Sequence, residues 1–142
     1  MASFFEGISS RPAHLSPVAR FTVACGVFYL LTGVAMLAGA DPLCDVVAAV
    51  EGYRITDVGL LRVAGMTVGF IGWFYVGGGR TGADSFALFT VVDRLLVPFL
   101  LVPIWWEGLA PGSLILPFAA LDPLLGLVAL ALWRRGPAPI RG

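Results

Sequence analysis

The chain contains no lysine, asparagine or glutamine, and apart from one histidine its basic residues are nine arginines. That histidine, His14, precedes the first long apolar segment, so no apolar segment offers an imidazole ligand for a haem, a chlorophyll or a metal ion. The two cysteines, Cys25 and Cys44, form no CxxC motif, and no Cys/His/carboxylate cluster has metal-ligand spacing. We therefore expect no metal site, no cofactor and no disulfide.

Signatures of known catalytic sites are missing as well. The sequence has no nucleophile elbow, P-loop or dinucleotide fingerprint. Residues 77–80, Gly-Gly-Gly-Arg, are typical of a flexible turn rather than a phosphate loop, because no helix-opening Lys-Ser/Thr follows them. The formal net charge is zero, which argues against a basic surface for nucleic acid. We assign no catalytic residue.

Apolar sequence, by contrast, is abundant: 58% of the residues are hydrophobic and only 13% are charged. Four apolar segments of about 20 residues follow one another, and each would form a helix of about 30 Å, the thickness of the hydrocarbon layer. The sequence therefore predicts an all-α integral membrane protein, a single transmembrane domain built as a four-helix bundle. The predicted spans are residues 21–40, 58–76, 86–105 and 113–133.

The arginines outside the spans predict the orientation of the bundle in the membrane. Six of them lie before span one, between spans two and three, or after span four, whereas only Arg54 lies among the connections of the other side. The positive-inside rule places both termini, residues 1–19 and 134–142, in the cytoplasm. The N-terminal segment lacks the basic-then-apolar order of a cleavable signal, so span one is expected to be retained. The arginine-only composition is typical of a GC-rich bacterial genome, and we expect the bacterial inner membrane.

The connection from Asp41 to Asp57 is long enough to hold an element of its own. Its apolar residues recur at helical spacing, at Leu43, Val46, Val47, Val50 and Tyr53. This pattern predicts a short external amphipathic helix that packs against the bundle or lies on the membrane surface, with a lid as the alternative.

Aromatic residues gather near the ends of the predicted spans. They form two belts typical of membrane-interface anchors, made by Trp73, Tyr75, Trp105, Trp106 and Trp133.

Span two carries small residues on one helical face. Gly65, Gly69 and Gly72 recur at three- and four-residue spacing, which permits close contact with another helix. Arg62 belongs to the same stripe and is expected to point into a helix interface near the external end. The alternative is that Arg62 extends to the external head groups.

Three ionisable residues, Asp93, Arg94 and Asp122, fall in the middle of predicted spans, where an unpaired charge costs several kcal/mol. Counted along their helices, Arg94 and Asp122 lie about 15 Å and about 13–14 Å from the external face. We therefore predict a buried ion pair between them. Asp93 then needs a donor of its own, for which the candidates are Arg62, Thr32, Thr67 and Tyr29.

This polar network has two interpretations. It either holds the helices in register or forms a functional polar cavity. The second interpretation is favoured by prolines within the last two spans, because each one frees a backbone carbonyl one turn back. These prolines are Pro98, Pro103, Pro117 and Pro123.

The first span suggests a family. Arg20 followed by residues 26–33, Gly-Val-Phe-Tyr-Leu-Leu-Thr-Gly, resembles the first-span pattern of DoxX-like small four-helix bacterial membrane proteins. The size and the topology with both termini inside fit the resemblance. It implies a four-helix membrane protein that acts as a partner of redox assemblies or has no assigned activity, and it transfers no catalytic residue.

The function predicted from these features is that of a small non-enzymatic subunit or assembly partner of a larger bacterial inner-membrane complex. Its partners would be membrane lipid and other membrane subunits or copies of itself. The alternative is an oligomeric small-molecule or proton-coupled transporter or binding protein that uses Asp93, Arg94 and Asp122. A third hypothesis is an enzyme that acts on a lipid-like substrate with an intramembrane carboxylate as acid or base.

Overall fold

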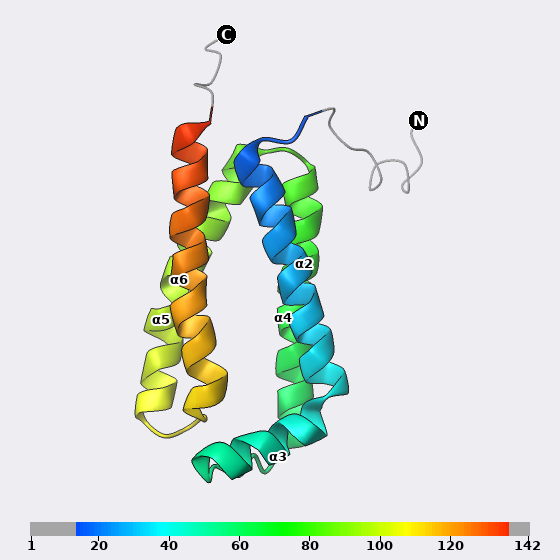
Figure 1. The fold of residues 1–142 in the computed structure, drawn as a ribbon, viewed down its shortest axis with the longest axis vertical. Coiled ribbons are helices and arrows are strands. Elements are labelled where there is room, and N and C mark those ends of the chain that lie inside the picture. The colour runs from blue at the N-terminus through cyan, green and yellow to red at the C-terminus, as the bar shows by residue number, and fades with distance from the viewer. Residues whose placement is uncertain (1–13, 137–142) are drawn as a thin grey trace.

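The computed structural model describes residues 14–136, which form five helices and no strand (Figure 1). Four of the helices are long and apolar enough to cross a membrane. The predicted all-α four-helix bundle is therefore confirmed, although most of the predicted terminal segments, 1–19 and 134–142, lie outside the described residues. The helices are α2 (Pro17–Ala38), α3 (Ala40–Glu51), α4 (Val58–Arg80), α5 (Asp84–Trp106) and α6 (Gly112–Arg135).

The predicted short helix in the first connection is present as α3. A single residue, Gly39, separates it from the end of α2 and interrupts the helical backbone between the two. Within α3, the side chain of Val47 is buried, whereas those of Val46 and Val50 on the predicted apolar face are exposed. The helix ends at Gly52, whose φ of 67° is a left-handed conformation that glycine adopts readily.

The prediction of a flexible turn at residues 77–80 is wrong. These residues form the last turn of α4, and the chain turns afterwards at Gly82, which has a φ of 71°. Packing explains the difference: a Cβ on Gly79 would lie 2.8 Å from Val23 Cγ2 in α2. The missing side chain lets α4 approach α2 up to its end, which compensates the low helix propensity of glycine.

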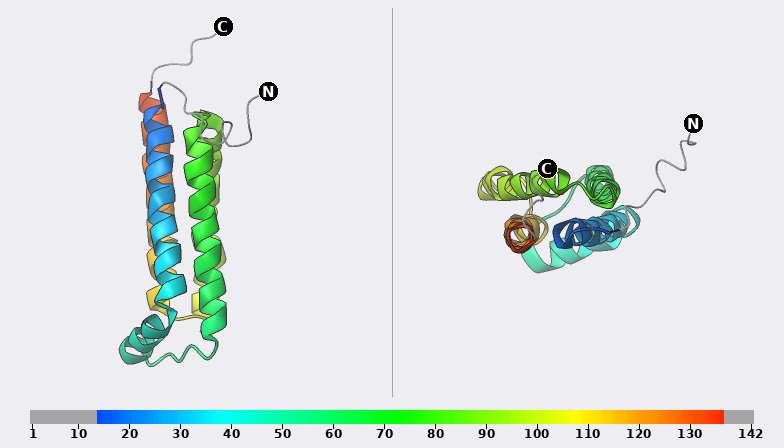
Figure 2. Two further views of the ribbon diagram at one scale, coloured as in Figure 1. Left: turned by 90° about the vertical axis from the view of Figure 1, so that its right-hand side faces the viewer. Right: turned by 90° about the horizontal axis from the view of Figure 1, so that it is seen from above.

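The four long helices form two antiparallel pairs, α2 with α4 and α5 with α6 (Figure 1, Figure 2). The pairs lie close together at the end where α2 begins and separate toward the end that carries α3 and the α5–α6 connection. We call the latter the α3 end. The space between the two pairs therefore widens toward the α3 end.

Glycines set the contact between α2 and α4. A Cβ on Gly72 would lie 2.4 Å from the backbone nitrogen of Leu30, and one on Gly33 would lie 2.4 Å from that of Gly69. Gly65 and Gly26 are similarly close to the opposite helix. Distances this short leave no room for a side chain, so the two backbones are in direct contact. The predicted glycine face of span two thus packs against α2 of the same chain.

Hydrogen bonds join the start of α2 to α5 at one end of the bundle and α3 to α6 at the other. At the end opposite α3, Ser16 caps α2, and its hydroxyl donates to the carboxylate of Asp84 at the start of α5 over 2.6 Å. At the α3 end, the carboxylate of Glu51 accepts hydrogen bonds from the backbone N–H groups of Gly112 (2.8 Å) and Ser113 (2.5 Å). Glu51 thereby satisfies donors that the first turn of α6 leaves free.

Candidate functional site

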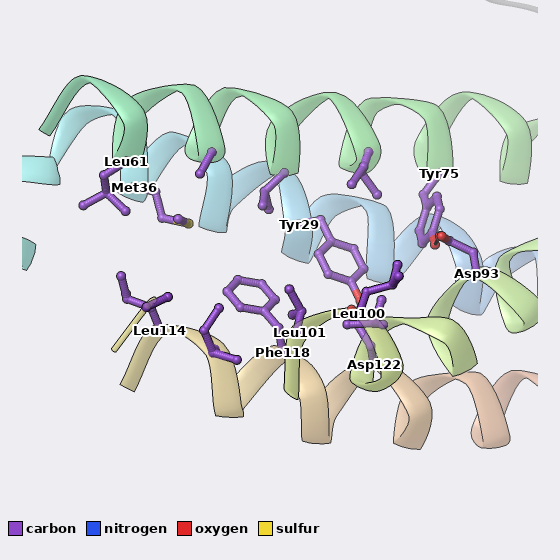
Figure 3. A pocket seen from close by; sticks show the side chains of 16 residues that line it. Tyr29, Met36, Leu61, Tyr75, Asp93, Leu100, Leu101, Leu114, Phe118 and Asp122 are labelled. Atoms are coloured by element: carbon purple, nitrogen blue, oxygen red, sulfur yellow. Dashed lines mark hydrogen bonds between the residues drawn. The ribbon is translucent and has the colours of Figure 1, made fainter. Parts of the chain in front are cut away.

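A cavity of about 410 Å³ lies between the two helix pairs (Figure 3). Its walls come from α2 and α4 on one side and from α5, α6 and the connection between them on the other. Four of its lining residues carry polar groups, and the others are apolar. The lining residues are Tyr29, Met36, Leu61, Ala64, Val68, Ile71, Tyr75, Asp93, Val97, Leu100, Leu101, Ala110, Leu114, Ile115, Phe118 and Asp122.

The polar residues of the cavity are gathered at one end, away from α3. Figure 3 shows Leu61, Met36 and Leu114 at the apolar end, and Tyr29, Tyr75, Asp93 and Asp122 at the other. We call these four polar residues the floor of the cavity. The distance along α4 from Leu61 to Tyr75 is about 21 Å at 1.5 Å per residue. The cavity is thus a long apolar chamber with a polar floor.

The floor consists of two tyrosine–aspartate hydrogen bonds that cross between the helix pairs. Tyr29 in α2 donates to Asp122 in α6, and Tyr75 in α4 donates to Asp93 in α5 over 2.5 Å. The two tyrosine rings meet edge to face, with centroids 5.6 Å apart and an interplanar angle of 89°. One helix pair therefore supplies both donors, and the other supplies both acceptors.

Arg94 lies next to the floor but does not line the cavity. Its side chain is buried, with 1% of its surface exposed, and its guanidinium carbon lies 4.8 Å from the centroid of the Tyr75 ring. This is the geometry of a cation–π contact, which supports a cation in a desolvated place. The guanidinium nitrogens have no hydrogen-bond acceptor among the described residues, although the group acts electrostatically on Asp122 and Cys25.

The predicted ion pair between Arg94 and Asp122 is not formed. The one ion pair among residues 14–136 joins Arg62 and Asp41, and the carboxylate of Asp122 accepts from Tyr29 instead. Depth along the helices predicts a similar level for Arg94 and Asp122, and the arginine acts electrostatically on that carboxyl group. Depth does not determine the direction in which each side chain points, because that depends on the rotation of each helix.

Arg62, a candidate donor for Asp93, does not bond to the intramembrane acids. Its side chain is half exposed and forms an ion pair of 2.7 Å with Asp41, close to the start of α3. The donors suggested for Asp93 were Arg62, Thr32, Thr67 and Tyr29, and none of them serves it. Both threonines instead donate to a backbone carbonyl of their own helix.

The prediction that Tyr75 belongs to an aromatic belt at the membrane interface is wrong. Its ring is buried, with 6% of its surface exposed, and its hydroxyl bonds to Asp93. Trp73, two positions earlier, is 60% exposed, as expected of a residue at a lipid-facing surface. A signal was present in the sequence: Tyr75 is four residues from Ile71 and seven from Val68, on the stripe of α4 that faces the cavity.

The floor can accept hydrogen bonds but has few donors to offer. Each ionised carboxylate has about four acceptor positions, of which a tyrosine hydroxyl uses one. Both tyrosine hydroxyl protons are directed to the carboxylates. No group of His, Cys, Asp and Glu side chains within the described part of the chain has the arrangement needed to hold a metal ion. The arrangement is suited to a group that donates hydrogen bonds.

Comparison with known proteins gives no relative: no protein-family model, curated protein or solved structure matches the chain. The resemblance to DoxX-like proteins therefore stays a prediction. The cavity and its floor are the features of the structure that indicate a function.

Proposed function

We propose that this protein binds a lipid-like small molecule within the bacterial inner membrane, in the cavity between its two helix pairs. The apolar chain of the ligand would lie along the apolar walls toward the α3 end, and its polar end would contact Asp93 and Asp122. The observation that carries the proposal is the cavity itself, which is apolar along its length and polar at one end.

The dimensions of the cavity support this proposal. Ligand sites in proteins usually enclose 300–1,000 Å³ and combine mostly apolar walls with a few polar groups that orient the ligand. A volume of about 410 Å³ falls within this range. A carboxyl group in the core of a bilayer costs free energy. A role in ligand binding would explain why this chain carries two of them there.

The orientation we propose places both termini in the cytoplasm and α3 on the external side, in accordance with the arginine distribution. The apolar end of the cavity would then face the external side, and its floor would lie about halfway through the membrane. A molecule from the outer leaflet would enter between α4 and α5 or between α2 and α6. Transport across the membrane would require a further opening past the floor, whereas binding requires only the cavity.

The hypothesis of a subunit of a larger membrane complex has less support. The glycine face of span two, one of the features that favour such a subunit, is occupied by α2 of the same chain. The subunit hypothesis remains a prediction, as does the hypothesis of a lipid-modifying enzyme.

The experiment that tests binding compares two substitutions on α4. Ala64 lines the cavity, whereas its neighbour Val63 is 53% exposed on the outer surface of the bundle. The protein is extracted in mild detergent, and the molecules that remain bound are identified by native mass spectrometry. We expect Ala64→Phe to fill the cavity and lose the retained molecule, and Val63→Phe to keep it. Equal retention by both variants would contradict the proposal.

A further inference from the structure

The charge at the cavity floor indicates the chemistry of the ligand's polar end. We infer that this end is a cation, most simply the protonated amine of a long-chain amphiphile. The inference rests on the proposed function, since it describes the head group of the molecule bound in the same cavity.

The charges that a ligand would meet in the cavity are of one sign. The charged residues that line the cavity are Asp93 and Asp122, and both are acids. Arg94, the cation nearest to them in the structure, is covered by the ring of Tyr75 and has 1% of its surface exposed. A negatively charged head group would therefore face two carboxylates and would be repelled.

The ionised side chains at the floor do not balance one another in charge. With Asp93, Arg94 and Asp122 all ionised, the cluster carries one negative charge in excess. The hydroxyls of Tyr29 and Tyr75 donate to the two carboxylates and add no charge to the cluster. An excess charge in a medium of low dielectric constant is unfavourable by several kcal/mol. One bound monocation removes the excess without changing any of the observed hydrogen bonds.

The two floor carboxylates have open hydrogen-bond acceptor positions. Each carboxylate accepts from one tyrosine, which leaves most of its acceptor positions open. An ammonium group offers up to three donors and no acceptor, so it complements two carboxylates that have no donor to offer. Charge-assisted bonds of this kind are roughly twice as strong as neutral ones.

Aromatic side chains line the cavity beside the floor. Tyr29 and Phe118 both line the cavity near Asp122, as Figure 3 shows. The faces of aromatic rings attract ammonium groups, and recognition of amines by such rings is common in ligand sites. Tyr29 thus places an aromatic ring beside Asp122, and the ring of Phe118 follows toward the apolar end.

The test uses three photoreactive probes with identical diazirine-bearing alkyl chains that end in an amine, an alcohol or a carboxylic acid. Each is added to the full-length protein in zwitterionic lipid nanodiscs at neutral pH. Labelled peptides are mapped by mass spectrometry, and specific labelling is that removed by an excess of the unreactive analogue. We expect the amine to label cavity residues such as Leu101 and Phe118 about tenfold more than the alcohol, and the acid least.

Two matched variants locate the effect. Asp93→Asn removes a charge from the floor and retains the size and an acceptor oxygen, whereas Asp41→Asn removes a charge from the exposed pair outside the cavity. We expect Asp93→Asn to reduce labelling by the amine to the level of the alcohol, and Asp41→Asn to leave it unchanged. The comparison of probes on the unaltered protein holds even where a variant does not fold.

The outcomes separate the two claims. If the three probes label the cavity equally, or if Asp93→Asn leaves the preference for the amine unchanged, the inference of a cationic head group is overturned. A proton on one carboxyl group would then balance the charge. If no probe labels the cavity specifically, the proposed binding function itself fails.

Discussion

Tyr29 in α2 and Asp122 in α6 are hydrogen-bonded across the two helix pairs, although 93 positions separate them in the sequence. Tyr75 and Asp93 form the corresponding bond between α4 and α5. A carboxyl group in a membrane helix is tolerated when a neighbouring helix supplies a donor. In this bundle the same two bonds also form the floor of the cavity, so packing and binding depend on the same side chains.

The first prediction concerns the bond between Tyr29 and Asp122. Tyr29→Phe removes the donor and leaves a buried carboxyl group with an unused acceptor, which costs about 1–3 kcal/mol of unfolding free energy. A double-mutant cycle with Asp122→Asn, measured by reversible denaturation in mixed micelles, is expected to give a coupling energy of about 0.5–3 kcal/mol. Tyr53→Phe, which removes a hydroxyl bonded to an exposed carbonyl at Leu109, is the control and should change stability by about 0.5 kcal/mol or less. A coupling energy near zero would contradict the assignment.

The second prediction concerns the glycine contact between α2 and α4. Gly72→Ala places a Cβ within 2.4 Å of the backbone nitrogen of Leu30, and neither backbone can yield without separating the helices. We expect a loss of about 1–3 kcal/mol from overpacking. Gly77→Ala on the same helix meets no atom within 4 Å and should be neutral or stabilising by up to about 1 kcal/mol, because alanine favours the helix. Thermal unfolding of the two variants side by side distinguishes them, and equal destabilisation would refute the close contact.

The third prediction compares two arginines. Arg94→Gln removes the buried cation beside Asp93 and Asp122 and leaves two acids without a counter-charge, so we expect a loss of about 3–5 kcal/mol. Arg62→Gln breaks an exposed pair with Asp41 and should cost about 1 kcal/mol or less. Denaturation curves in detergent provide both values. A small effect of Arg94→Gln would mean that the guanidinium does not compensate the acids.

The fourth prediction is a pH dependence at the α3 end. Hydrogen bonds from Ser113, first from its side chain and then from its backbone, together with the N–H of Gly112, hold the pKa of Glu51 below its ordinary value of 4.5. A lowered pKa in the folded state means that the stabilisation is complete above the ordinary value. It is lost as the pH falls through the lowered pKa. The amide resonances of Gly112 and Ser113 should therefore titrate below pH 4.5.

The control for this titration is Glu51→Gln, which should remove the transition from both amide resonances. Glu107→Gln, at the end of α5, should leave it in place. A transition at or above the ordinary carboxyl pKa would show that Glu51 does not cap α6 in solution.

Much of the fold could be predicted from the sequence, because hydropathy and helix length determine the spans directly. The short helix after span one was predicted from the spacing of Leu43, Val46 and Val47. The helical end of α4 was missed because three glycines in a row suggest a turn. Their context was informative: Gly65, Gly72 and Gly79 recur every seven residues, as do Ala19, Gly26 and Gly33 in α2, and these two series face each other.

The candidate site was predicted only in part. The sequence drew attention to Asp93, Arg94 and Asp122 because charges are rare in spans, and all three lie in or beside the floor. Opposite charges at one depth suggested an ion pair, whereas the structure uses neutral tyrosine donors. Tyrosine is common both at membrane interfaces and in buried networks, so its role at position 75 depends on helix rotation, which hydropathy does not determine.

The most direct test of the account is a solid-state NMR measurement in lipid bilayers on protein with ¹³C-labelled tyrosine and aspartate. The chain has only three tyrosines, so assignment is tractable. We predict cross-peaks from the ring carbon that bears the hydroxyl of Tyr29 to the carboxyl carbon of Asp122, and from that of Tyr75 to Asp93. With labelled arginine added, a close contact of Asp122 with the guanidinium carbon of Arg94, and no contact with Tyr29, would contradict the account.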